Sequence, residues 1–175
     1  MSTLILVTAH SETAAVLEQA LADSERIYFV TAGVSPNDPD NTIERWLAGR
    51  AYKADDTWYD DYRLLRYATA DTLTRVQYTP HGLFISDGEN NPVTLVASRV
   101  QPQARTGEII PVEIQFMLHQ AAISDLRWFV QVLSPAGVAV AQYDSAPDDN
   151  FTPFSTLPDN EILTDNAGLQ LPTDL

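Results

Sequence analysis

Hydrophobic and polar positions follow two different periods along the chain. In residues 1–70, short apolar runs alternate with stretches in which apolar residues recur every three or four positions. In residues 71–175 that longer period disappears, and single apolar and polar residues alternate instead. Because alternation is typical of strands and the longer period is typical of helices, the pattern predicts an α+β chain. A small α/β subdomain at 1–70 would precede a β-sandwich at 71–175.

The first half alternates strand and helix signals. A strand, a helix and a strand in sequence favour a right-handed crossover between two parallel strands. Asn41, with Glu44 three residues on, has the spacing of a capping box at the start of the second helix, and Gly49 is suited to ending it. We therefore predict a βαβαβ-like arrangement, with strands at 4–9, 26–32 and 62–68 and helices at 12–22 and 41–49.

The second half consists of short strand signals separated by turn residues. Strands spaced about 8–12 residues apart predict an Ig-like sandwich. After residue 145 the only strand candidates are two short runs, so we expect the sandwich to be incomplete at its C-terminus or finished by another element. The predicted strands are 83–85, 93–97, 109–118, 128–133 and 138–143, with weaker candidates at 162–164 and 168–171.

The predicted hairpin over 128–143 is apolar on both faces. Alternation places Trp128, Val130 and Val132 on one face and Phe129 and Leu133 on the other. One face would enter the sandwich core. The other needs a second cover, which could be the α/β half or a part of a larger assembly.

Charge and composition exclude some classes of binding partner and of chemistry. The formal net charge is -14, and the ten Lys and Arg are scattered, whereas phosphate binding needs a basic patch. We therefore expect no nucleic-acid partner. There is no cysteine, which excludes disulfides and thiolate chemistry. No apolar run reaches the ~18 residues of a membrane helix, and the N-terminus lacks the pattern of a signal peptide.

Candidate catalytic and metal-binding residues are few. His10 follows a predicted strand and opens a helix, where ligand sites often form, although we favour the interpretation of a polar turn with a helix cap. Acidic turns offer the oxygen ligands that calcium prefers, but such residues also simply build turns. The weak metal candidates are Asp87, Glu89, Asp148 and Asp149, and no cofactor is predicted.

Exposed aromatic rings could bind a carbohydrate. Trp58, Tyr59 and Tyr62 lie close together in sequence, and Trp128 begins the predicted hairpin. Buried aromatics usually serve packing, so we favour the interpretation that they cover the seam between the two halves.

Several stretches resemble the soluble C-terminal region of bacterial GT-C type membrane glycosyltransferases, which are related to protein O-mannosyltransferases and aminoarabinose transferases. The resembling segments are IERWL at 43–47, YRLLRY at 62–67, Gly-Glu at 107–108 and the hairpin FVQVL…AQYD at 129–144. The resemblance implies an extracytoplasmic accessory region whose catalytic carboxylates and lipid-linked donor site lie in an absent membrane part.

Three functions follow as hypotheses. The first is a non-catalytic accessory domain that positions an acceptor or supports the membrane-embedded portion of the same or a neighbouring protein, at the extracytoplasmic face of a bacterial membrane. The second is a carbohydrate-binding sandwich, with or without calcium. The third is an enzyme that uses His10, although we do not expect the chain to be an enzyme by itself.

Overall fold

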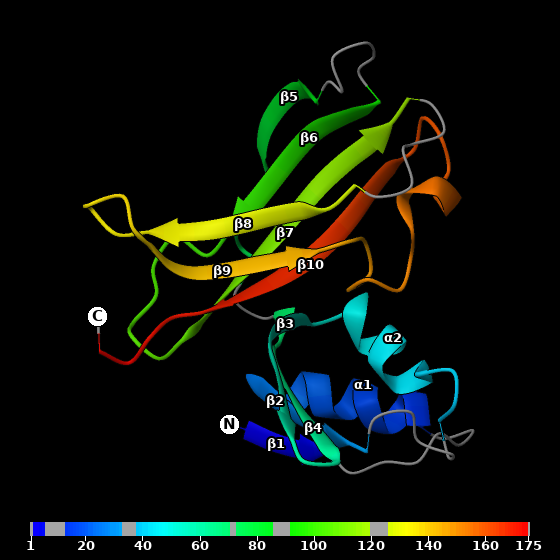
Figure 1. Ribbon diagram of the computed structural model, residues 1–175, viewed down its shortest axis with the longest axis vertical. Coiled ribbons are helices and arrows are strands. Elements are labelled where there is room, and N and C mark those ends of the chain that lie inside the picture. The colour runs from blue at the N-terminus through cyan, green and yellow to red at the C-terminus, as the bar shows by residue number, and fades with distance from the viewer. Residues whose placement is uncertain are drawn as a thin grey trace.

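The computed structural model describes residues 2–5, 13–32, 38–70, 73–85, 92–119 and 126–174. Strands hold 49% and helices 15% of the described residues, so the chain is mostly β. The strands form two four-stranded sheets and a separate two-stranded hairpin (Figure 1). Among the described residues, no helix is long and apolar enough to span a bilayer.

The first sheet has the strand order β1-β2-β4-β3. β1 and β2, which α1 connects along the chain, pair in parallel. β4 pairs antiparallel with both β2 and β3. Both helices pack on one face of this sheet, where Leu17 and Leu47 contact Ile27, Leu65 and Tyr67. The elements are β1 (Ser2–Ile5), α1 (Thr13–Asp23), β2 (Arg26–Thr31), α2 (Thr42–Ala48), β3 (Tyr52–Tyr59) and β4 (Tyr62–Ala68).

Two details of this half differ from the predictions. The predicted third strand is present as β4, but it forms a hairpin with β3, a strand that the sequence pattern does not predict. The capping box is also wrong, because the Asn41 side chain does not cap the helix. Instead, the Asp38 carboxylate accepts hydrogen bonds from the N–H groups of Thr42 (2.7 Å) and Ile43 (3.1 Å). Gly49 ends α2 as predicted.

The named strands of the second half all pair antiparallel. Its four-stranded sheet has the order β10-β7-β6-β5, and β8 pairs with β9 alone within the described chain. The two weak strand candidates near the C-terminus join into one strand, β10, that pairs with β7 along its whole length. The strands are β5 (Thr79–Ile85), β6 (Val93–Val100), β7 (Ile109–Leu118), β8 (Trp128–Leu133), β9 (Ala139–Ser145) and β10 (Ile162–Gln170).

The β8–β9 hairpin lies across one face of the four-stranded sheet (Figure 1). Trp128, Val130 and Val132 point toward this sheet, as the alternation predicts, and pack with Val112 and Leu169. On the outer face of the hairpin, Phe129 is 66% and Leu133 is 56% exposed. The α/β half therefore does not cover the outer apolar face.

Part of the opposite face of the four-stranded sheet packs against the first half. β10 crosses β3 so closely that a Cβ atom on Gly168 would lie 2.7 Å from the carbonyl oxygen of Tyr52 and 2.9 Å from that of Lys53. Beside this crossing, Tyr52 packs with Leu73 and Ile109. The two halves share a core at this seam.

A buried carboxylate completes the seam. Glu113, on β7, receives two hydrogen bonds from Arg99 (2.6 and 2.9 Å) and one each from the hydroxyls of Tyr52 and Tyr78. Burial raises the pKa of Glu113, but these donors outweigh it and hold the pKa below its usual value. The carboxylate therefore stays charged, and it ties β3 to β6 and β7.

Gly168→Ala tests the close crossing of the two sheets. The added methyl group would overlap backbone oxygens that cannot rotate away, so we expect the free energy of unfolding in urea to fall by ~2–3 kcal/mol. Gly49→Ala is the matched control, because nothing lies within 4 Å of its Cβ position and its φ is −82°. Equal stability of the two variants would contradict the crossing.

Candidate functional site

The main candidate site is an apolar groove between the four-stranded sheet and β8. Its floor follows from alternation on β7, because Ile110, Val112, Ile114 and Phe116 share the face that is turned away from the seam. β6 extends this floor, and its bulge between Leu95 and Ala97 keeps Leu95, Ser98 and Val100 on the groove side.

The groove is of ligand size. Its volume is about 610 Å³, within the range of small-molecule sites. One wall is formed by residues 128–132 of β8, and Leu126, Phe154 and Leu169 add apolar surface. The floor from Ile110 to Phe116 spans about 20 Å, at roughly 3.4 Å per residue.

Few polar groups face the groove. Ser98, Gln101 and Gln131 line it, and Arg127 is the charged residue among the described lining. The Arg127 guanidinium already donates to Asp144 (2.9 Å) and to the Asn150 side chain (2.8 Å). The groove therefore suits an occupant whose inner surface is apolar and uncharged.

A buried carboxyl group holds the wall of the groove in place. The indole N–H of Trp128 donates to Asp165 Oδ2 (2.7 Å), and Asp165 Oδ1 accepts from the backbone N–H groups of Asp148 (3.2 Å) and Asn166 (3.0 Å). These hydrogen bonds lower the pKa of Asp165, but burial raises it by more, so that the pKa is about 6. Trp128 also packs against the Tyr143 ring, with 5.5 Å between ring centroids.

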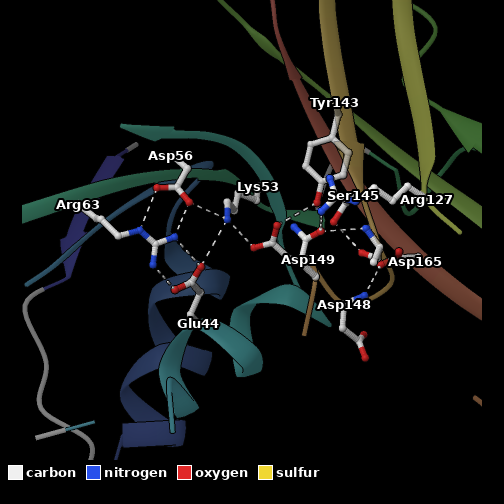
Figure 2. A network of polar contacts seen from close by, with 12 residues as sticks. Glu44, Lys53, Asp56, Arg63, Arg127, Tyr143, Ser145, Asp148, Asp149 and Asp165 are labelled. Atoms are coloured by element: carbon white, nitrogen blue, oxygen red, sulfur yellow. Dashed lines mark hydrogen bonds and ion pairs between the residues drawn. The ribbon is translucent and has the colours of Figure 1, made fainter. Parts of the chain in front are cut away.

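An ion-pair network joins the loop after β9 to the first half (Figure 2). Lys53 Nζ lies 2.6 Å from Asp149, 3.1 Å from Asp56 and 3.4 Å from Glu44, and Arg63 pairs with both Glu44 and Asp56. Burial lowers the pKa of Lys53, but the three carboxylates outweigh burial and raise it. The network stabilises the same seam as Glu113 does.

Two of the four metal candidates already have hydrogen-bond partners within the chain. Asp149 accepts from Lys53 and from the Tyr143 hydroxyl (3.2 Å), and Asp148 accepts from the Thr152 hydroxyl (2.6 Å). In the part of the chain that is described, no group of three His, Cys, Asp or Glu side chains is arranged to hold a metal ion. Asp87 and Glu89 lie outside the described residues, as does His10.

The four aromatic candidates do not form one site. Trp58, Tyr59 and Tyr62 gather at the turn between β3 and β4, where they are 58%, 60% and 58% exposed. Their interpretation as seam-covering residues is wrong, because such exposure leaves them uncovered by the second half. Trp128 instead belongs to the packed wall of the groove.

The turn between β3 and β4 presents aromatic rings on both faces. Tyr59 and Tyr62 are cross-strand partners, so their side chains share one face of the hairpin. Trp58 is opposite Arg63 on the other face, with the guanidinium 5.5 Å from its ring centroid. We call these three residues, Trp58, Tyr59 and Tyr62, the aromatic tip.

Comparison with protein-family models, with curated proteins and with solved structures finds no match for the chain. The function must therefore be argued from the groove and the aromatic tip. Of the groove residues, Trp128 alone was predicted from the sequence as a site residue, although the alternation on β7 indicated which side chains share the floor. No signal in the sequence shows that part of this floor stays uncovered.

The raised pKa of Asp165 predicts a pH dependence of stability. A carboxyl with a higher pKa in the folded than in the unfolded chain holds more protons when folded, so its contribution to stability falls as pH rises through its folded pKa. The free energy of unfolding of the wild type should therefore fall by ~2–3 kcal/mol between about pH 4 and 6, relative to Asp165→Asn.

The measurement is urea unfolding of the wild type and of Asp165→Asn across this pH range. Trp128→Phe removes a hydrogen-bond donor that favours the charged carboxylate, so it should raise the pKa of Asp165 further. The fall in the free energy of unfolding should then extend to higher pH. A wild type whose stability rises relative to Asp165→Asn over the same interval would contradict the assigned environment of Asp165.

Proposed function

We propose that the chain is a non-catalytic accessory domain of a membrane glycosyltransferase-like protein, at the extracytoplasmic face of a bacterial membrane. Its second half would be an Ig-like sandwich that is finished by another element. The observation that carries the proposal is the open apolar groove beside β8, which is built to receive a partner. The family resemblance supplies the identity of that partner, the membrane-embedded portion of the same or a neighbouring protein.

The groove supports binding in three ways. Its floor lies on a sheet whose other face is fixed by the Gly168 crossing and the Glu113 hydrogen bonds, so the surface is formed before a partner arrives. Its lining is apolar, so burial of a partner there is favourable at roughly 25 cal/mol per Å² of apolar surface. The exposed outer face, with Phe129 and Leu133, lies directly beside it and offers further contact.

The test is binding of a soluble peptide of alternating valine and threonine with a lysine at each end, measured by calorimetry on the whole chain. Val100→Asp places a carboxylate in the groove and should weaken binding by about tenfold or more. Val138→Asp is the matched control, because Val138 is 62% exposed and does not line the groove. Unchanged affinity in Val100→Asp would contradict the proposal, as would turnover of a lipid-linked sugar by the purified chain.

A second function, carbohydrate binding, is favoured by the aromatic tip. Three aromatic side chains more than half exposed on one turn offer platforms on which sugar rings could stack. The acceptor glycan of a glycosyltransferase-like protein would be a suitable ligand. This function needs neither the groove nor a metal ion.

Trp58→Ala should reduce glycan-array binding to background if the aromatic tip holds sugars, because the largest exposed ring would be lost. Phe84→Ala is the control, since Phe84 is 67% exposed on β5 and lies on the other sheet. The array is read with and without calcium. Equal glycan signals for the wild type and Trp58→Ala, or no signal at all, would remove carbohydrate binding as a function of this turn.

A further inference from the structure

The groove runs along an unpaired strand edge. Within the described chain β8 pairs with β9 alone, and the groove is lined by residues of β8 but by none of β9. In an antiparallel pair, every second residue turns its N–H and C=O groups away from the partner strand. The outer N–H and C=O groups of β8 therefore border the groove, where a further strand could pair with them.

The space beside β8 has the dimensions of one strand. β8 and β9 cover the sheet over β7 and β10, through contacts of Trp128 and Val130 with Val112 and Leu169. A strand added next to β8 would lie about 4.8 Å further on, above β6. β8 (Trp128–Leu133) offers six residues with which such a strand could pair.

We propose that the groove takes an extended segment of a partner polypeptide, which pairs with β8 as an added β-strand. Its alternate side chains fill the groove and are apolar and uncharged, since the Arg127 charge is already met by Asp144. Its other side chains face solvent. This inference rests on the proposed function, for which it supplies the chemistry of the partner.

A second copy of the chain fits this position poorly. Antiparallel pairing of two β8 strands places a twofold axis normal to the hairpin, so the four-stranded sheets of both copies would lie on the same side. The sheet of the second copy would then occupy the space of β5 and β6, which continue the sheet beyond β7. A segment without a sheet of its own avoids this overlap.

The test uses three peptides with the same side chains and the same charge. One is the unmodified valine–threonine peptide, one carries N-methyl groups on all valines and one carries them on all threonines. Because N–H groups on a strand alternate in direction, one methylated set would face β8 and the other would face solvent. One methylated peptide should therefore bind about tenfold more weakly, and the other should bind like the unmodified peptide.

Each other outcome overturns the inference in a distinguishable way. Equal binding of all three peptides, lost in Val100→Asp, would leave the proposed function intact and exclude strand pairing. Failure of all three peptides to bind, with or without binding of laurate in their place, would overturn both. Dimerisation of the chain in sedimentation equilibrium, reversed by Val100→Asp, would assign the groove to a second copy.

Discussion

Two strands cannot cover a sheet of four strands. Neighbouring strands lie about 4.8 Å apart, so the β8–β9 hairpin covers about half the width of the sheet that it packs on. The covered part, along β10 and β7, forms a core in which Trp128 and Val130 pack with Val112 and Leu169, and these last two side chains also line the edge of the groove. The uncovered part, along β6 and the groove-facing side chains of β7, is the apolar groove. The candidate site is therefore a direct consequence of unequal layers.

On the other face of the sheet, the first half covers the region around Gly168 and Glu113. Gly168 allows β10 to cross the backbone of β3. Beside this crossing, the buried charges of Glu113 and Lys53 are paired with Arg99 and Asp149. A buried charge is tolerated when it is paired and hydrogen-bonded, and removing one partner is costly. The first half thus acts as a rigid support for the sheet, and the open groove lies on the opposite side.

The sequence predicted the features of the fold that depend on the residues of a single strand or hairpin. The alternation on β7 and the apolar faces of the β8–β9 hairpin were recognisable in the sequence because side-chain direction in a strand has a period of two. β3 was missed because it carries Lys53 and Asp56 where a buried strand would carry apolar residues. These charges are satisfied by Glu44 and Arg63, which lie on other elements. The groove could not be predicted for a similar reason: it depends on which strands pair with one another, and a single strand's sequence does not determine this.

The central claim is that β8 has an open edge that faces an apolar floor, and amide hydrogen exchange tests it most directly. In the free chain, alternate amides of β8 should exchange fast while those bonded to β9 exchange slowly. With the valine–threonine peptide bound, the fast set should become protected and the slow set should be unchanged. Protection of every β8 amide in the free chain, or no gain in protection with the peptide bound, would contradict the account.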